Sequence, residues 1–248
     1  MSILITRPEP NASAICQALA QFNIDAIAAP LLQLSPCENL HQLSQAIQHS
    51  DILIAVSEHA VHSVDLSLQR LQVHWPSQIQ YFAIGDKSQK TLHNCCQRPV
   101  LCPTVGVTSE ALLERKELKN IAGKQILIIR GPSGRDLLYE QLSARGATVQ
   151  YYQAYQRHYL PISSQQWQHW QSIISHLVIT SGDMLNYLYQ QCPKSAQNWL
   201  TDRTLWVPSE RISEIAKAIG FNRIQVVSRA DNATLIAALR QAKQDGTL

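Results

Sequence analysis

Arginine and serine residues recur close behind short apolar runs of this 248-residue chain. Guanidinium and hydroxyl groups donate hydrogen bonds to anions, so a cluster of them would bind carboxylates or phosphates. The residues concerned are Arg7, Ser57, Ser88, Arg130, Arg135, Ser181, Ser209 and Arg211. Any one of them could instead cap a helix or form a surface ion pair. The set as a whole predicts a site for a polyanion.

The motifs of nucleotide, metal and hydrolase sites are missing. No G-x-G-x-x-G or G-x-x-x-x-G-K-[ST] pattern occurs, and Gly131-Pro132-Ser133-Gly134-Arg135 has the spacing of neither. His59 and His62 stand three apart on an expected helix but lack a third ligand, and G-x-S-x-G is absent. The six cysteines form no C-x-x-C pair, so we expect them to be reduced, mostly buried and without a metal or redox role. We therefore expect no cofactor and no metal.

The elements that must position these residues follow a regular order. Short apolar runs alternate with helix-period stretches, which is typical of parallel-sheet α/β units. We expect strands at 3–6, 25–28, 52–56, 81–84, 125–129, 148–151, 177–180, 205–207 and 224–227. Asp231 is expected to cap the last helix, and Gly146 or Gly220 to end a helix with positive φ. The polar turns then lie at the carboxyl edges of sheets, where open α/β folds bind ligands.

The chain also contains an internal repeat. The run 3–7 returns as 126–130, at an offset of 123 residues. An offset of 124 relates three further parts of the chain: the runs 52–57 and 177–181 when they are aligned at Ser57 and Ser181, the pairs Ile84-Gly85 and Pro208-Ser209, and the pairs Thr108-Ser109 and Asn232-Ala233. Several markers at one offset indicate duplication. Two similar lobes imply a cleft, and we expect the site between them.

Composition narrows the class of partner. Lys and Arg number 21 and Asp and Glu 18, and the formal charge of +3 is too small for a duplex-binding protein yet suits a small polyanion. No apolar stretch approaches the roughly 20 residues that span a bilayer, and no targeting signal precedes the first expected strand. We expect a cytoplasmic protein that binds neither nucleic acid nor membrane. The lack of an exposed apolar stripe favours a monomer.

Fragments of the sequence resemble, in order and spacing, the bacterial uroporphyrinogen-III synthase family. They are Ile5-Thr6-Arg7-Pro8, Ala83-Ile84-Gly85, the run 130–138, Arg145-Gly146-Ala147, Tyr155-Gln156-Arg157, Thr180-Ser181, the run 208–212 and Gly220-Phe221. The match extends from residue 3 to about residue 239. Two positions depart from the family pattern: Glu58 stands where a small residue, Pro or Asn is usual, and Ser88 where Thr is common.

The resemblance implies an α/β fold of two similar flavodoxin-like parallel-sheet lobes joined by a two-stranded antiparallel ladder. Residues 1–31 with 161–248 would form one lobe and residues 37–152 the other. Residues 32–36 and 153–160 would cross between them. Pro36 and Pro161 end the crossing segments, as suits strands that leave a domain.

The resemblance also implies a reaction. A member of this family is a hydro-lyase that cyclises hydroxymethylbilane, a linear tetrapyrrole with eight carboxylates, to uroporphyrinogen III with inversion of ring D and loss of water. The arginines and serines named above would bind the substrate. Tyr155 takes the family's tyrosine position and would donate a proton toward the departing hydroxyl. Tyr151, Tyr152 and Tyr159 lie nearby, so this assignment depends on the strand register.

Partners and alternatives follow from the same reasoning. The enzyme that makes hydroxymethylbilane is expected to contact this protein transiently. A two-lobed module that binds a small anion without turnover would share the duplication and the cleft. A two-domain glycosyltransferase would share the fold class and bind a nucleotide. Turnover of hydroxymethylbilane and binding of nucleotides discriminate among these three.

Overall fold

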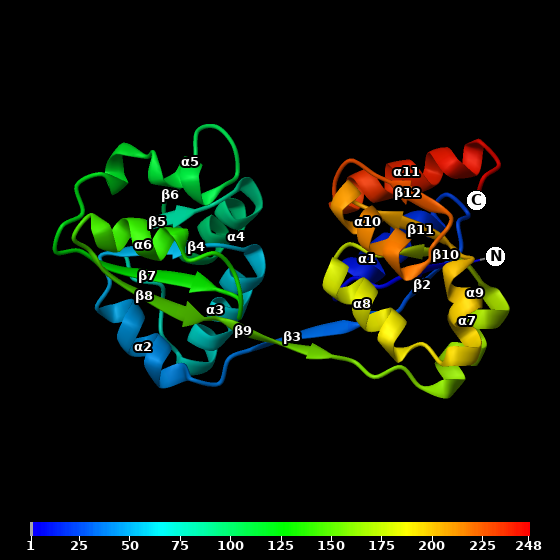
Figure 1. Ribbon diagram of the computed structural model, residues 1–248. Coiled ribbons are helices and arrows are strands. Elements are labelled where there is room, and N and C mark those ends of the chain that lie inside the picture. The colour runs from blue at the N-terminus through cyan, green and yellow to red at the C-terminus, as the bar shows by residue number, and fades with distance from the viewer. Residues whose placement is uncertain (1) are drawn as a thin grey trace. The chain divides into compact units, whose positions relative to one another are not determined.

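Buried aliphatic runs form the strands. In the computed structural model, which describes residues 2–248, Ile3, Leu4 and Ile5 are at most 1% exposed, and the run 53–55 is wholly buried. Strands of a parallel sheet are covered by helices on both faces, which explains why these runs are apolar throughout rather than alternating. The runs belong to two separate five-stranded parallel sheets (Figure 1).

Unit 1 contains the described residues up to Gln33 together with His158–Leu248. Its sheet has the order β12-β11-β10-β1-β2. The strands are β1 (Ser2–Ile5), β2 (Ala26–Ala28), β10 (Ile174–Val178), β11 (Thr204–Val207) and β12 (Ile224–Val226). The helices are α1 (Asn11–Ala20), α7 (Ser164–Ile173), α8 (Gly182–Gln191), the 3-10 helix η2 (Lys194–Ala196), α9 (Gln197–Thr201), α10 (Glu210–Ile219) and α11 (Asn232–Gln244). Helices α1 and α11 cover one face of the sheet, and α7, α8, α9 and α10 cover the other.

Unit 2 is Leu34–Arg157, with a sheet of order β6-β5-β4-β7-β8. The strands are β4 (Ile52–Ala55), β5 (Gln80–Ala83), β6 (Val100–Leu101), β7 (Gln125–Arg130) and β8 (Thr148–Gln153). The helices are α2 (Leu40–Gln48), α3 (Glu58–Leu71), α4 (Asp86–Cys96), α5 (Ser109–Leu113), the 3-10 helix η1 (Lys116–Leu118) and α6 (Leu137–Ala144). Helices α2, α3 and α4 pack on one face, and α5 and α6 on the other.

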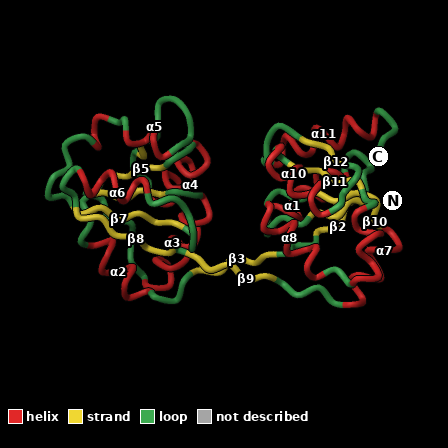
Figure 2. The backbone as a smooth tube through the Cα atoms, viewed as in Figure 1, coloured by secondary structure: helices red, strands yellow, loops and turns green. Residues whose placement is uncertain are grey.

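Two further strands, β3 (Leu32–Pro36) and β9 (Tyr155–Tyr159), pair with each other (Figure 2). The Cys37 N–H donates to the Ala154 carbonyl at 3.0 Å, and the Leu160 N–H donates to the Leu31 carbonyl at 3.0 Å. These two bonds bracket the pair at opposite ends, so the strands run antiparallel. The predicted fold class is confirmed: two parallel-sheet α/β units and a two-stranded antiparallel ladder.

The two sheets have the same strand order when they are read from β12 and from β6. Strand β1 corresponds to β7, and β10 corresponds to β4, which agrees with the offsets of the sequence repeat. Strand β1 opens the chain, whereas β7 comes late in unit 2. Each half of the sequence therefore contributes to both units, although every strand of one sheet has an equivalent in the other sheet.

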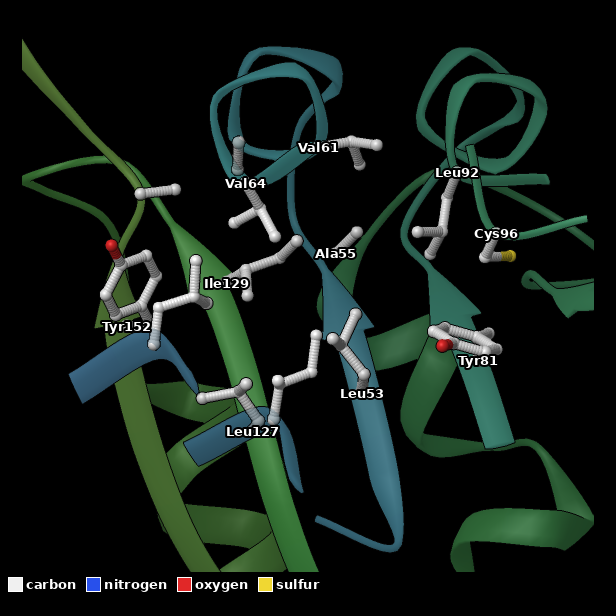
Figure 3. Packing of buried hydrophobic residues seen from close by; sticks show 14 of the residues in the cluster. Leu53, Ala55, Val61, Val64, Tyr81, Leu92, Cys96, Leu127, Ile129 and Tyr152 are labelled. Carbon is white, nitrogen blue, oxygen red and sulfur yellow. The ribbon is translucent and has the colours of Figure 1, made fainter. Parts of the chain in front are cut away.

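The core of unit 2 fixes the strand ends that bear candidate site residues. Figure 3 shows Leu53 and Ala55 of β4 and Leu127 and Ile129 of β7 beneath Val61 and Val64 of α3. All six of these side chains are fully buried. Full burial of a Val, Leu or Ile side chain stabilises a fold by roughly 1.5 to 3 kcal/mol. Such packing holds the carboxyl ends of β4 and β7 in place.

Helix ends follow the predicted chemistry. Asp231 accepts the Thr234 N–H at 2.9 Å and caps α11, while Gly146 and Gly220 have φ of 84° and 112°. Both predictions are confirmed. Within residues 2–248, no helix is long and apolar enough to cross a membrane.

Three expectations need correction. Strand β10 begins at Ile174, three residues before the predicted start, because α7 passes directly into it and polar Ser175 and His176 masked the strand. Strand β6 was missed because it has two residues. The six cysteines are free, but only Cys96 and Cys192 are buried, and the other four are partly exposed.

Candidate functional site

A pocket of about 230 Å³ opens where β4 and β7 end in unit 2. Four predicted site residues line it: Ser57, Arg130, Arg135 and Tyr155. The rest of the lining is Val56, Ser109, Ile128, Gly131, Ser133, Gly134, Leu138 and Tyr151. The carboxyl edge of a parallel sheet is the expected place for a ligand in an open α/β fold. The structure therefore gathers part of the predicted polar set on one unit.

Ser57 stands between β4 and α3. Its backbone is extended, with φ of −154° and ψ of 155°, and its hydroxyl accepts the Ala60 N–H at 3.1 Å. Ser57 is thus the N-cap of α3, and the positive end of the helix dipole lies beside the pocket. Glu58, the first residue of α3, is not among the residues that line the pocket.

Arg130 is the last residue of β7, and its side chain is 14% exposed. Its Nη1 donates to Asp136 Oδ1 at 3.0 Å, and its Nη2 donates to the Gly134 carbonyl at 2.9 Å. The guanidinium carbon lies 4.4 Å from the centre of the Tyr151 ring. The Tyr151 hydroxyl donates to the same Asp136 oxygen at 3.1 Å. Burial, and then this bond to Asp136, raise the pKa of Tyr151.

Arg135 is more accessible, since its side chain is 64% exposed. Its two terminal nitrogens donate to the two carboxylate oxygens of Glu110, at 2.5 and 3.1 Å. This bidentate pairing lowers the pKa of Glu110 to about 2. Both arginines of the pocket thus already face a carboxylate of the protein.

Tyr155, the first residue of β9, is 5% exposed. Its ring meets the His59 ring edge to face, with the ring centres 6.2 Å apart. Its phenol lies against the backbone of Gly131: a Cβ on residue 131 would come within 2.6 Å of Tyr155 Cζ and closer still to the hydroxyl oxygen. Only a residue without a side chain leaves room for the phenol in this position.

The other predicted residues of the polar set, apart from Ser88, belong to unit 1. Arg7 Nη1 donates to the Ala230 carbonyl and to Asn232 Oδ1, the latter at 2.7 Å. Ser181 caps α8 by accepting the Met184 N–H at 3.4 Å. Ser209 is the N-cap residue of α10, but its side chain makes no capping bond. Arg211 is exposed and forms no ion pair with any residue of the described range 2–248.

Ser88 is not brought to the pocket. It is the third residue of α4 and is 7% exposed, and with Leu92 and Cys96 it forms the buried face of that helix. A spacing of four residues places these side chains on one side of a helix. The sequence resemblance gave no information about which face of α4 would be buried.

Comparison with known proteins shows which family the chain belongs to. A family model described as uroporphyrinogen-III synthase HemD matches residues 13–237. The chain is 38% identical to the uroporphyrinogen-III synthase of Escherichia coli (strain K12) over 248 residues, which cover 97% of this chain and all of that protein. The chain belongs to the uroporphyrinogen-III synthase family. The uroporphyrinogen-III synthase of Salmonella typhimurium is also 38% identical, over 97% of this chain and all of its own.

Uroporphyrinogen-III synthases of known structure share the fold. A mutant of the Thermus thermophilus protein superposes with a TM-score of 0.61 at 14% identity, covering 99% of each chain. The Helicobacter pylori protein gives a TM-score of 0.61 at 14% identity, covering 97% of this chain and 99% of its own. Identities this low support the fold and carry no residue roles.

In this uroporphyrinogen-III synthase family member, the pocket residues Ser109 and Ser133 were not among the predicted site residues, and Tyr151 was considered only as a neighbour of Tyr155. Tyr151 and Tyr152 alternate on β8, and the structure half-buries the first and buries the second. Period-two alternation was the signal that could have separated them. Among residues 2–248, no three His, Cys, Asp or Glu side chains gather as a metal site would require. The pocket instead offers hydroxyl, guanidinium and backbone N–H donors, which suit carboxylates.

Proposed function

We propose that this chain catalyses the reaction of its family, the closure of hydroxymethylbilane to uroporphyrinogen III with inversion of ring D and loss of water. Similarity to the Escherichia coli enzyme along nearly the whole chain carries this proposal. The pocket of unit 2 supports it, because anion-binding groups and a phenol line the same small space.

The polycarboxylate substrate is bound by several modest contacts. The proposed ligands in unit 2 are Ser57 and Arg135, and those in unit 1 are Arg7, Ser181, Ser209 and Arg211. A helix N-terminus stabilises a nearby anion by roughly 0.3 to 1 kcal/mol, and a hydrogen bond to a charged group contributes roughly 1.5 to 3 kcal/mol. Five or six such contacts give micromolar binding once ordering costs are subtracted.

The pocket takes one end of the substrate. Its volume of about 230 Å³ is below the roughly 300 to 1,000 Å³ of pockets that bury a whole drug-sized ligand. We place the ring that bears the hydroxymethyl group here, because the Tyr155 phenol lies at this pocket. Arg135 would exchange Glu110 for a substrate carboxylate, which its exposure allows.

Tyr155 assists departure of the hydroxyl. Its O–H donates a proton to the leaving oxygen while the pyrrole nitrogen supplies the electron pair, so the C–O bond breaks and water leaves. The phenolate that remains takes up the proton of the pyrrole N–H, which gives the neutral azafulvene and restores the phenol. The substituted carbon of ring D attacks this azafulvene and gives a spiro intermediate. The older bond between that carbon and the neighbouring methylene group then breaks, which forms a second azafulvene, and the unsubstituted α-carbon of ring D attacks it and loses a proton, so the macrocycle closes with ring D inverted. Because the substrate is reactive by itself, the protein's main task is to hold one conformation and prevent direct closure.

The rate of hydroxymethylbilane consumption tests the proposal. The purified protein at micromolar concentration should consume freshly made hydroxymethylbilane faster than buffer alone. A thermal-shift titration with nucleotides should leave the melting temperature unchanged, whereas a glycosyltransferase would be stabilised. Consumption at the buffer rate would instead favour an anion-binding module.

The proposal also includes a cellular location, an oligomeric state and a partner. We place the enzyme in the cytoplasm, as a monomer that receives hydroxymethylbilane through transient contact with the enzyme that makes it. Sedimentation velocity at micromolar concentration tests the monomer, and a stable dimer would contradict it.

A further inference from the structure

The loop between β7 and α6 is held by Arg130. This residue uses two of its nitrogens to bind groups of the loop itself, the Asp136 carboxylate and the Gly134 carbonyl. Gly134 has a φ of +153°, and a Cβ there would lie 3.1 Å from Arg130 Nη2. Glycine at position 134 therefore allows both the backbone conformation and the close approach of the guanidinium.

Tyr151 also holds Asp136, and we call Arg130, Asp136 and Tyr151 together the clamp. In the register of β7 and β8, Ile128 lies opposite Tyr151 and Arg130 opposite Gln153. Arg130 and Tyr151 are therefore diagonal neighbours on one face of the sheet, which brings the guanidinium over the ring. The Tyr151 hydroxyl donates to the Asp136 oxygen that Arg130 also holds. Asp136 is thus fixed from two adjacent strands.

The loop that the clamp holds begins at Gly131, which contacts the Tyr155 phenol. Gly131 follows Arg130 directly, and its backbone lies against Tyr155 Oη and Cζ. If this loop shifted, the Gly131 backbone would move and the Tyr155 phenol would change its position. Arg135, on the same loop, differs because it reaches outward to Glu110 and is largely exposed.

We propose that Arg130 is a positioning residue that, with Asp136 and Tyr151, holds the loop 131–135 so that the Gly131 backbone keeps the Tyr155 phenol in place, and that Arg130 binds no substrate carboxylate. The proposal rests on the proposed function, because the phenol acts on hydroxymethylbilane only there. It revises the sequence-based prediction that Arg130 binds substrate. The revision follows from the two hydrogen bonds and the low exposure of the Arg130 side chain.

Two substitutions separate positioning from substrate binding. Arg130→Lys keeps a positive charge but replaces the two separate nitrogens that hold Asp136 and Gly134 with a single ammonium nitrogen. Asp136→Ala leaves Arg130 in place and removes its carboxylate partner. If Arg130 positions the loop, both variants lower kcat about tenfold and change KM by less than about twofold. If Arg130 instead binds substrate, Arg130→Lys should raise KM and leave kcat unchanged, and Asp136→Ala should lower KM. Either of these results would overturn the proposal.

Coupling to Tyr155 gives a second readout. Combined with Tyr155→Phe, neither substitution should lower kcat further, because both act through the phenol. Losses that multiply would contradict the proposal. Lys119→Met, which removes an exposed partner of Glu114 elsewhere in unit 2, is the control that should leave kcat and KM unchanged. If Asp136→Ala does not fold, Tyr151→Phe removes a single hydroxyl from the clamp and should lower kcat about twofold.

A readout without turnover keeps the two proposals apart. The fluorine resonance of fluorotyrosine at position 155 should shift in Arg130→Lys and Asp136→Ala and stay in place in Arg135→Lys and Lys119→Met. Wild-type turnover is measured beside it. If the wild type shows no turnover but the resonances shift, the result contradicts the proposed function and supports the clamp. If the wild type turns over normally but the resonances do not shift, only the clamp is overturned.

Discussion

Ser57 and Ser181 occupy equivalent places in the two units. Each follows the middle strand of its sheet, β4 or β10, and each accepts the backbone N–H three residues further on, from Ala60 at 3.1 Å and from Met184 at 3.4 Å. Both serines are therefore helix caps. A hydroxyl that accepts one hydrogen bond can still donate another, so capping does not exclude a contact with substrate.

Aspartate at these positions should separate the two roles. Aspartate caps a helix about as well as serine, so Ser57→Asp and Ser181→Asp should change the free energy of unfolding by less than about 0.5 kcal/mol. Its charge repels substrate carboxylates, so KM for hydroxymethylbilane should rise at least about fivefold. Ser57→Asn and Ser181→Asn are neutral capping controls. An equal KM for the Asp and Asn variants would mean that the serines only cap.

Removing the Tyr155 hydroxyl should slow the chemical step. Tyr155→Phe keeps the buried ring against His59 and Gly131, so the fold and KM should change little. Loss of the donor to the leaving oxygen should lower kcat by about tenfold or more. Steady-state kinetics with a melting curve check this. A wild-type kcat would leave the enzyme with positioning alone.

Arg211 should contribute to substrate affinity. It is exposed in the first turn of α10 and forms no ion pair with residues 2–248, so Arg211→Ala should raise KM about tenfold and leave kcat nearly unchanged. Lys217→Ala is the matched control, because Lys217 lies on the same helix and is paired with Glu214. Equal KM values for the two variants would remove Arg211 from the proposed site.

Freeing Arg135 should strengthen substrate binding. The bidentate bond from Arg135 lowers the pKa of Glu110 to about 2, so this carboxylate is ionised at neutral pH and competes with the substrate. Glu110→Gln removes the competing charge and should lower KM about two- to fivefold. A higher KM would show that Glu110 holds Arg135 in its binding position instead.

Unit 1 should lose stability in mild acid through His176. This residue is 6% exposed, and its Nδ1 accepts the Trp206 indole N–H at 3.3 Å. Burial, and then the charge of Arg203, lower the pKa of His176 below its ordinary value of 6.5. The unfolded chain therefore binds a proton that the folded chain does not, and the free energy of unfolding falls as the pH drops below 6.5.

His176→Asn keeps an acceptor for Trp206 and cannot titrate. Its free energy of unfolding in urea should therefore fall less between about pH 7.5 and about pH 5.5 than that of the wild type. Identical pH slopes for the two proteins would contradict this assignment.

Most of the fold could be predicted from the sequence because both sheets are made of continuous apolar runs. Those runs predicted the ends of most strands to within two residues, and the repeat predicted that β1 and β7 are equivalent strands of the two sheets. The pattern failed at β10, where a polar Ser175-His176 pair enters a buried strand, and at β6, which is too short to have a period. Tertiary packing decides both cases.

Less of the site could be predicted, because a pocket depends on loop conformation and on which partners the side chains find. The resemblance singled out Ser57, Arg135 and Tyr155, which the structure places around one pocket. It could not show that Arg130 turns to Asp136, nor that Ser88 lies on the buried face of α4. It also left open the choice between Tyr151 and Tyr155, both of which line the pocket.

The ratio of product isomers shows whether this chain inverts ring D. Hydroxymethylbilane closes without an enzyme to the uninverted isomer, so the protein is supplied with fresh substrate and the oxidised products are separated by chromatography. We predict at least about a hundredfold excess of uroporphyrinogen III, which requires about 2.7 kcal/mol between the competing barriers. An isomer ratio equal to that of the enzyme-free control would mean that the chain does not direct the closure with inversion.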